Sequence, residues 1–562
     1  MKQILECVPN FSEGVDMGII RQISDEIESV DNVKLLDVDP GKATNRTVVT
    51  FVGEPGAVIQ AAFLAVKKAS EIIDMTKHSG EHPRFGATDV CPLIPVANIS
   101  MEETVEWARK LAERIGTELH FPVYCYENAA FMEERRNLAS VRSGEYEGLK
   151  EKLKDKHWTP DFGPAVFVPK TGSLAVGARD FLVAYNINLN TTSTRRANAI
   201  AFDVRERGRS KREGNSLNGK IVKDKQSNPV MIPGSLKSVK AIGWFIEEYG
   251  VAQISMNLTN ISITSVHEAF DEVCKRAEAR GIRVTGSELV GLVPLSAMLD
   301  AGRYFLKKQQ RSLGVSDSEL IKIAVKSLGL DELGPFVPKE KIIEYKMNQG
   351  TAGKLNAMTI MAFMEETASE SPAPGGGSVS AYIGSLGVAL GTMVANLTSH
   401  KRGWDDKWET FSEWAVKGKN IQEELLRLVD EDTAAFNLIM DAFSLPKYSE
   451  IEKKQRSKAI RVATIHAIKI PLKVMTTANK GFELIEAMIQ SGNPNSISDA
   501  GVGAIAIRSC ILGAHLNVLI NMDGMEMDDE LQSIKKQADS MADKAVNKEK
   551  SLLIQVRSKI LD

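Results

Sequence analysis

The segment K-H-S-G-E-H-P-R-F-G-A-T-D-V-C-P, which starts at Lys77, carries a dense group of side chains that transfer protons or bind charge. Six such residues fall within fourteen positions: His78, Glu81, His82, Arg84, Asp89 and Cys91. A neutral imidazole is the side chain best matched to proton transfer near pH 7, and a neighbouring carboxylate such as Glu81 can orient it. An arginine such as Arg84 can hold a carboxylate or a developing anion through two parallel hydrogen bonds. These residue types predict acid–base catalysis.

The same segment contains the zinc-binding pattern H-x-x-E-H, from His78 to His82. A zinc site of that type requires both histidines on one helix, so that their rings converge on the metal. Gly80 lies between the two histidines, and Pro83 pushes His82 out of the helical region into extended or turn geometry. We therefore expect no metal, and a zinc peptidase is the minor alternative. A surface loop in which both histidines are incidental is the third interpretation.

Three segments resemble glutamate formimidoyltransferase: V-P-N-F-S-E-G at Val8–Gly14, H-S-G-E-H-P-R-F-G-A-T-D-V-C-P at His78–Pro92, and T-G-S-E-L-V-G-L-V-P at Thr285–Pro294. The second half of the chain resembles formimidoyltetrahydrofolate cyclodeaminase, which is fused to the transferase in the bifunctional enzyme of histidine degradation. The alternative is a transferase whose helical half is a cyclohydrolase-like or non-catalytic folate-binding module. The resemblance implies that His82 is the general base. It would take the N5 proton of tetrahydrofolate while that nitrogen attacks the formimidoyl carbon of N-formimidoyl-L-glutamate. The imidazolium then returns the proton to the departing glutamate nitrogen.

The resemblance also implies a folate-binding stretch, G-P-A-V-F-V-P-K-T-G. Its candidate substrate-binding residues are Gly163, Pro164, Phe167, Val168, Lys170 and Gly172. Phe167 and Val168 suit a pterin or aminobenzoyl ring, or else form the core of a strand, and both interpretations stay open. Asp39, at the end of a predicted strand, resembles a site residue that assists polarisation, or else it only begins a turn.

Two segments in the second half have the residue types of a second site. In P-A-P-G-G-G-S-V-S-A, three glycines open a helix whose free N–H groups form an anion site, or they allow close helix packing. The resemblance favours a folate contact at Gly375, Gly376, Gly377 and Ser378. In V-D-E-D-T-A-A-F, helical spacing from Leu428 turns Asp432 inward, where burial raises a carboxyl pKa and makes the group a proton donor. The resemblance implies that Asp432 is catalytic in cyclodeamination. The alternative is a solvated acidic face.

Apolar periodicity indicates the elements that position these residues. In the first part, strands at 33–39 and 46–53 form a predicted antiparallel hairpin, and a helix follows at 56–74. After Leu330, long helical segments follow, punctuated by Pro446, Pro471 and Pro494. We predict an α/β fold of two sandwich subdomains with mixed sheets, followed by an all-α helical bundle. The predicted ranges are 1–180 and 181–330 for two transferase subdomains, 331–354 for a linker and 355–562 for the cyclodeaminase domain.

Composition limits the partners and the location. The chain has 562 residues, 43% apolar and 25% charged, which is typical of soluble globular proteins. Its net charge of −3 provides no overall attraction to nucleic acid or to an anionic membrane, and we expect neither as a partner. The five cysteines form no C-x-x-C pair, and the N-terminus lacks the apolar core of a signal peptide. These features predict a cytoplasmic protein.

The expected ligands are small molecules, namely formimidoyl-glutamate and tetrahydrofolate as a substrate with a polyglutamate tail. The basic run Arg205–Lys225 is either an exposed loop or a patch that holds the carboxylates of such a tail. The helical half has no obvious polar faces, which predicts a homo-oligomer.

Overall fold

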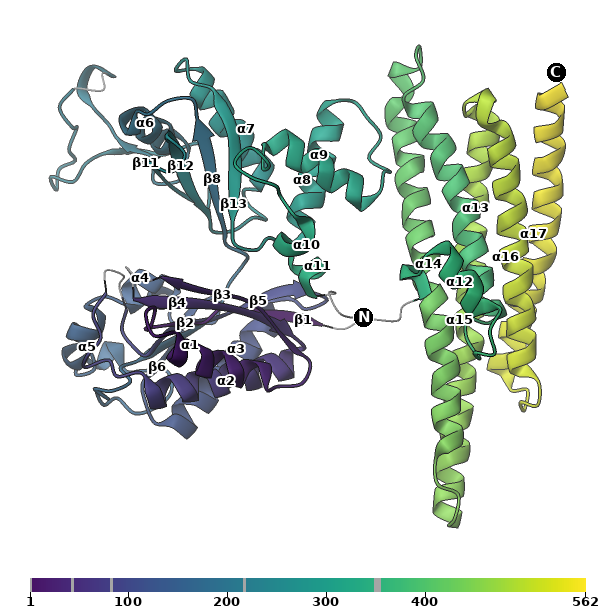
Figure 1. The fold of residues 1–562 in the computed structure, drawn as a ribbon, viewed down its shortest axis with the longest axis horizontal. Helices are drawn as coiled ribbons and strands as arrows, with labels where there is room; N and C mark the ends of the chain where they lie inside the picture. Colours follow the sequence, from purple (N-terminus) through teal and green to yellow (C-terminus); the bar gives the residue numbers. More distant parts are fainter. Residues whose placement is uncertain (1–2, 42–44, 81–83, 216–218, 348–354, 562) are drawn as a thin grey trace. The chain divides into compact units, whose positions relative to one another are not determined.

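The computed structural model describes residues 3–41, 45–80, 84–215, 219–347 and 355–561. Contacts group the chain into two compact units: Met1–Met298 with Val325–Gln349, and Leu299–Ala324 with Gly350–Asp562. The predicted boundaries at residues 180, 330 and 354 stay predictions. The ribbon in Figure 1 shows α/β layers in the purple-to-teal part of the chain and long helices in the green-to-yellow part, as predicted.

The first sheet has seven strands in the order β1-β4-β2-β5-β7-β6, with β3 paired to β4. The strands are β1 Ile4–Cys7, β2 Asn10–Phe11, β3 Val33–Gly41, β4 Arg46–Gly53, β5 Thr88–Ala97, β6 Val123–Glu127 and β7 Leu174–Ala178. The sheet is mixed, because β7 pairs parallel with β5 and β6 while β3 and β4 pair antiparallel. The predicted hairpin is therefore confirmed.

Helices cover both faces of this sheet. On one face lie α1 Met17–Glu28, α2 Pro55–Ile72 and α3 Met101–Leu119 (Figure 1). They share a buried core with strand residues such as Cys91 and Cys125. The alternate strand residues Val90 and Tyr124 point to the opposite face, where α4 Leu138–Val141 and α5 Glu145–Lys152 pack. Two 3-10 helices, η1 Glu133–Arg136 and η2 Lys156–Trp158, flank them.

The second sheet has the strand order β11-β12-β8-β13. Its elements are β8 Val183–Leu189, α6 Thr194–Val204, β11 Val239–Ile246, β12 Val251–Leu258, α7 Val266–Glu278 and β13 Val284–Val290, with a small ribbon of β9 Arg209–Ser210 and β10 Met231–Ile232. Its described strands pair only antiparallel, so the prediction of a mixed sheet holds for the first sheet alone. Next come α8 Leu295–Lys308, α9 Asp317–Leu328, α10 Pro338–Lys341 and α11 Ile343–Met347, of which α11 packs through Ile343 on the first sheet.

The second unit is a helical bundle with one continuous apolar core. Its helices are α12 Ile360–Thr367, α13 Gly376–Ser399, α14 Trp408–Ser444, α15 Glu450–Ser491, α16 Ile497–Met522 and α17 Asp529–Leu561, with 3-10 turns η4 Leu355–Ala357, η5 Asp405–Lys407 and η6 Pro494–Ser496. The segment between α8 and α9 joins this unit, where Ser312 Oγ donates to Asn396 Oδ1 at 2.6 Å. By length and hydropathy alone, α13 and the segment Pro494–Met522 could each span a membrane. In the bundle, however, 61% of the apolar 18-residue stretch of α13 is buried, and 39% of that of Pro494–Met522.

The expectation that Pro471 interrupts the helices is wrong, because Pro471 lies inside α15. A proline has no N–H to donate to the carbonyl four residues earlier, which here belongs to Ala467. Asn521 of α16 supplies the missing bond, since its Nδ2 donates to the Ala467 carbonyl at 2.9 Å. A side chain from the neighbouring helix thus stabilises the helix at the proline.

Candidate active sites

The predicted general base His82 lies outside the described residues, as do Glu81 and Pro83. The described chain reaches Gly80 and resumes at Arg84. On both flanks, side chains hold the chain in place through contacts with other segments. The role of His82 itself stays a prediction.

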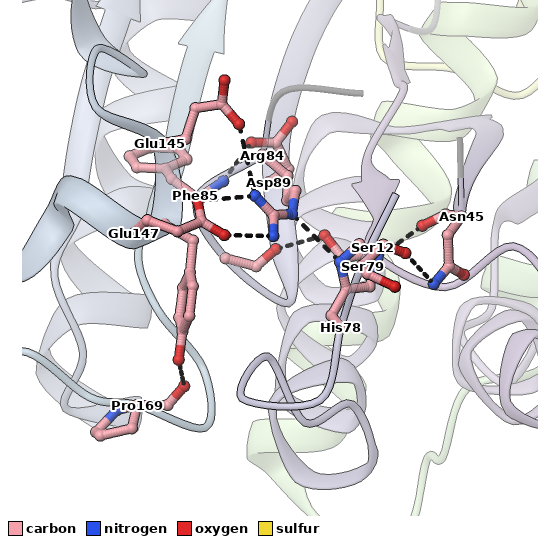
Figure 2. A network of polar contacts seen from close by, with 12 residues as sticks. Ser12, Asn45, His78, Ser79, Arg84, Phe85, Asp89, Glu145, Glu147 and Pro169 are labelled. Atoms are coloured by element: carbon pink, nitrogen blue, oxygen red, sulfur yellow. Dashed lines mark hydrogen bonds and ion pairs between the residues drawn. The ribbon is translucent and has the colours of Figure 1, made fainter. Parts of the chain in front are cut away.

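His78 is held through both nitrogens of its ring, as Figure 2 shows. Its Nε2 lies 2.8 Å from the carbonyl oxygen of Asn45, and a carbonyl only accepts, so Nε2 carries the hydrogen. Its Nδ1 then keeps a lone pair and accepts from Nε of Arg84 at 3.3 Å. The geometry describes a neutral imidazole in one tautomer. Because both nitrogens are engaged, this arrangement leaves neither of them for a zinc ion.

Arg84 connects the histidine to two acids at the start of α5. Its Nη1 and Nη2 donate to the two carboxylate oxygens of Glu147 at 3.0 and 2.7 Å, and Glu145 lies 3.5 Å from Nη1 (Figure 2). The hydrogen bonds that Arg84 donates to Glu147 raise the pKa of Arg84, although burial opposes the rise. The Arg84 side chain is 10% exposed. Its guanidinium is therefore largely engaged within the protein, and binding of substrate by Arg84 stays a prediction.

The predicted folate-binding stretch, residues 163–172, is an irregular loop before β7. The alternative that Phe167 and Val168 form the core of a strand is therefore wrong. Both side chains still pack on apolar clusters, and the ring of Phe167 lies 5.6 Å from that of Tyr146. Tyr146 joins this loop to Arg84: its Oη donates to the Pro169 carbonyl at 2.6 Å, and its backbone N–H donates to the Arg84 carbonyl at 3.0 Å. The structure thus brings together two of the predicted site segments.

The other predicted residues of this loop occupy defined positions. Gly163 and Gly172 have φ of +78° and +72°, a left-handed conformation that favours glycine. A Cβ on Gly172 would lie 2.3 Å from the Phe85 carbonyl oxygen, so glycine is needed there to let the loop approach the chain after Arg84. Pro164 is half-buried, and Lys170 is exposed and donates from Nζ to the Glu71 carbonyl.

Asp39 is exposed within β3, opposite Val48 of β4. The strand continues to Gly41, two residues beyond the end that was expected at Asp39. Its role in polarisation stays a prediction. In the basic run, Arg209 and the more distant Arg280 both pair with Asp203, which indicates that part of this run stabilises the fold.

A cavity of about 710 Å³ lies between the two α/β subdomains of the first unit. Both signs of charge line it: the cationic Arg136, Arg142, Arg179 and Lys240, and the acidic Glu127, Glu145 and Asp180. Arg142 also pairs with the fully buried Asp89, with 2.5 Å between Nη2 and Oδ2. Burial raises the pKa of Asp89, while Arg142 and Arg46 oppose the rise. The lining residues come from separate segments, so the sequence carries no local signal that joins them, although Arg136 and Arg142 lie close together in E-E-R-R-N-L-A-S-V-R.

In the bundle, Asp432 of α14 lies against the first turn of α13. A Cβ on Gly377 would lie 2.3 Å from Oδ1 of Asp432, so glycine is required to leave room for the carboxyl group. Ser378 Oγ lies 3.0 Å from Oδ2 of Asp432 and 3.2 Å from Oγ1 of Thr433. Gly375 is the N-cap of this helix and provides no side-chain cap. The structure thus places the predicted glycine turn and the predicted acid, Asp432, side by side.

The hydrogen bonds around Asp432 are compatible with a stored proton. Burial raises its pKa, although hydrogen bonds from Ser378 partly oppose the rise. Ser378 Oγ also lies 2.9 Å from the carbonyl oxygen of Val429, which only accepts. With its hydrogen on that carbonyl, Ser378 Oγ can accept from a protonated Asp432. The site therefore has a carboxyl group suited to donate a proton.

Three family descriptions match successive parts of the chain. They are "Formiminotransferase domain, N-terminal subdomain" at residues 4–179, "Formiminotransferase domain" at 184–348 and "Formiminotransferase-cyclodeaminase" at 359–540. The chain has two α/β subdomains with a charged cavity between them, and a helical bundle that holds a half-buried acid. Together with these matches, they define the class of a fused transferase and cyclodeaminase.

Known relatives match most of the chain, some in full and some in one half. Formimidoyltransferase-cyclodeaminase from Rattus norvegicus is 42% identical over 529 residues, 94% of each chain. Glutamate formimidoyltransferase from Thermoplasma acidophilum is 44% identical over 306 residues, 54% of this chain and 92% of the relative. Methenyltetrahydrofolate cyclohydrolase from Methylorubrum extorquens is 33% identical over 168 residues, 30% of this chain and 81% of the relative. The chain belongs to the formimidoyltransferase-cyclodeaminase family.

Proposed function

We propose that the chain catalyses two successive reactions on one folate in the degradation of histidine. In the α/β unit, N5 of tetrahydrofolate attacks the formimidoyl carbon of N-formimidoyl-L-glutamate, and the bond from that carbon to the glutamate nitrogen breaks. His82 takes the N5 proton and returns it to the leaving nitrogen. The product is 5-formimidoyltetrahydrofolate.

In the bundle, N10 of this product attacks the same carbon, the N10 proton passes to the terminal nitrogen, and the bond from the carbon to that nitrogen breaks. Asp432 supplies a proton, so that the nitrogen leaves as ammonia and 5,10-methenyltetrahydrofolate remains. The observation that carries this step is the contact between Asp432 and the turn at Gly377 and Ser378. There a carboxyl group of raised pKa lies against the N-terminal turn of α13, and the N-terminal end of a helix suits an anionic folate.

The four basic side chains of the cavity between the subdomains support binding of the two glutamate-bearing substrates of the transferase. Arg179 and Lys240 come from different subdomains and line the same space, which suits carboxylates that must be held at separate points. We assign the folate a polyglutamate tail and assign no metal to either step.

The test separates the two steps. Wild-type protein mixed with formimidoyl-glutamate and tetrahydrofolate should form methenyltetrahydrofolate, measured by its absorbance, and release ammonia. His82→Ala should lower glutamate release by a factor of about 10² to 10⁴, because one general base is lost, while supplied 5-formimidoyltetrahydrofolate still cyclises. Asp432→Asn should block cyclisation and leave transfer intact. Near-normal rates in both variants would contradict these roles.

A second candidate, a bundle that hydrolyses methenyltetrahydrofolate, is favoured by the 33% identity to a methenyltetrahydrofolate cyclohydrolase. Ammonia decides between the two functions. A cyclodeaminase releases one ammonia for each 5-formimidoyltetrahydrofolate consumed, whereas a cyclohydrolase consumes methenyltetrahydrofolate without ammonia.

We also propose that the protein is a cytoplasmic homo-oligomer that binds neither nucleic acid nor membranes. The bundle leaves apolar side chains exposed along α13 and α16: Leu386, Met393 and Leu397, and Val502, Ile505, Leu516 and Ile520. Their spacings of 7 and 4 residues on α13, and of 3, 11 and 4 residues on α16, form a stripe along each helix, which suits helix packing between copies. Analytical ultracentrifugation would measure the assembly.

A further inference from the structure

Asp89 is a fully buried carboxylate that joins two parts of the transferase site. Its Oδ1 accepts from the backbone N–H of Phe85 at 3.2 Å, and its two oxygens accept from Arg142, at 3.2 Å from Nε and 2.5 Å from Nη2. Phe85 follows the predicted general base His82 by three residues, and three residues span at most about 10 Å of chain. Arg142 lines the cavity between the subdomains. Asp89 thus fixes one cation of the cavity close to the segment that carries His82.

The guanidinium of Arg142 has a second edge that Asp89 does not occupy. Asp89 binds the edge formed by Nε and Nη2, whereas the edge formed by Nη1 and Nη2 can bind another carboxylate through two parallel hydrogen bonds. The Arg142 side chain is 15% exposed, and Asp89 is completely buried. In the described part of the chain, no ion pair joins Arg142 to the acids that line the same cavity, which are Glu127, Glu145 and Asp180.

Two of these acids have partners of their own. Oδ2 of Asp180 accepts from Nδ2 of Asn260 at 2.7 Å, and Oε2 of Glu145 lies 3.5 Å from Nη1 of Arg84. The second edge of Arg142 therefore suits a carboxylate that comes from a ligand.

The backbone on both sides of Arg142 is also held in place. Arg142 is the C-cap of α4. Nζ of Lys152 donates to the carbonyl of Val141 at 2.6 Å and to that of Ser143 at 3.2 Å. By comparison, the side chain of Arg136 in the same cavity is 50% exposed. Because Arg142 is already ordered, it loses little conformational freedom when it binds a carboxylate.

The chemistry of the two substrates indicates which carboxylate fits there. In N-formimidoyl-L-glutamate, the α-carboxylate is attached to the carbon that carries the departing nitrogen, so it must lie near the general base. In tetrahydrofolate, the first glutamate lies beyond the aminobenzoyl ring, far from N5. We propose that Arg142 binds the α-carboxylate of N-formimidoyl-L-glutamate through its Nη1 and Nη2 edge, and that Asp89 is the positioning residue that orients Arg142. This deepens the proposed function and rests on it.

The experiment removes one carboxylate from the substrate and one cation from the full-length protein. N-formimidoyl-4-aminobutyrate lacks the α-carboxylate, and N-formimidoyl-L-2-aminobutyrate lacks the γ-carboxylate. Arg142→Ala should lower kcat/KM for N-formimidoyl-L-glutamate about tenfold to hundredfold, as expected for a hydrogen bond between charged groups, and mainly through KM. With the 4-aminobutyrate compound, the variant and the wild type should react almost equally. Loss of the γ-carboxylate should slow both proteins by the same factor, and the KM for tetrahydrofolate should stay unchanged.

The same subdomain offers a matched control, because it has a second arginine bound to a buried aspartate. Nη1 of Arg135 donates to Oδ1 of Asp161 at 2.6 Å, and Oδ2 of Asp161 accepts from the backbone N–H of Cys125 at 2.7 Å. Arg135 is not one of the described residues that line the cavity. Arg135→Ala should therefore lower the melting temperature, yet keep the wild-type preference for a substrate with an α-carboxylate. Chromatography of the released amino compound measures transfer with every substrate.

A second variant keeps the test decisive if Arg142→Ala unfolds, since that change leaves a buried carboxylate unpaired. The double variant Asp89→Asn with Arg142→Met removes both charges, and it should also lose the preference for the α-carboxylate. Asp89→Asn alone turns an amide N–H toward Arg142 and should weaken the same preference.

Three outcomes would overturn the inference and leave the proposed function intact. The first is a retained preference for the α-carboxylate in a folded variant without Arg142. The second is a rise in KM for tetrahydrofolate in place of N-formimidoyl-L-glutamate, which would assign Arg142 to the folate tail. The third needs no variant: equal kcat/KM of the wild type for N-formimidoyl-L-glutamate and the 4-aminobutyrate compound. Wild-type protein that transfers no formimidoyl group to tetrahydrofolate would remove the proposed function as well.

Discussion

At the scale of single residues, the clearest finding concerns His78. The motif H-x-x-E-H makes it equal to His82, but the structure gives it a definite set of partners. Its ring donates to the carbonyl oxygen of Asn45 and accepts from Arg84. Arg84 in turn forms a bidentate ion pair with Glu147. Since this arrangement requires a neutral ring with the hydrogen on Nε2, His78 is suited to position the loop and not to shuttle protons.

His78→Ala should lower kcat/KM of the transferase by up to about thirtyfold, because two hydrogen bonds of about 1 kcal/mol each are lost beside the site. His78→Gln should restore much of the rate, since an amide both donates and accepts. Glutamate release measures the transferase, and cyclisation of 5-formimidoyltetrahydrofolate by the same variant serves as its control. Equal losses in both variants would show that hydrogen bonding at this position is not the cause.

At the scale of elements, the glycine turn at the start of α13 determines whether the carboxyl group of Asp432 has room beside it. Gly377→Ala places a methyl group 2.3 Å from Oδ1 of Asp432, closer than any ordinary contact, so the carboxyl group must turn away. We expect cyclisation to fall about a hundredfold, as for a displacement of reacting groups by about 1 Å. Gly375→Ala is the matched control, because its methyl group meets nothing within 4 Å. Similar cyclisation rates in the two variants would contradict the proposed place of Asp432.

At the scale of the whole molecule, a buried acid makes stability depend on pH. Glu6 of β1 is 5% exposed, and burial raises its pKa from 4.5 to about 7, helped by Glu344 of α11 and opposed by Arg179. The folded state therefore binds this proton more tightly than the unfolded state. Its contribution to stability is complete below pH 4.5 and is lost as the pH rises through about 7, by about 3 kcal/mol at most.

Glu6→Gln should remove this pH dependence. The difference in melting temperature between the variant and the wild type should grow in favour of the variant from pH 5 to pH 8, because glutamine stays neutral. Scanning calorimetry of the full chain measures both proteins under the same conditions. A constant difference across this range would show that Glu6 does not titrate within it.

Much of the fold follows from local periodicity. Alternating apolar residues predicted the hairpin of β3 and β4, and helical spacing predicted α2 within two residues at each end and long helices after Leu330. These patterns are local, because they report which face of one element is buried. Pro471 was misjudged because the partner that stabilises the helix there, Asn521, is distant in the sequence.

The sequence by itself determined the family, the order of the two modules and the candidate residues His82 and Asp432. Only the tertiary structure decided what surrounds them: the partners of His78, the cavity between the subdomains, and the turn at Gly377 against Asp432. The physical reason is that residue type and spacing reveal which chemistry a segment can perform. Which side chains meet across different helices and strands depends on long-range packing, and that carries no local signal in the chain.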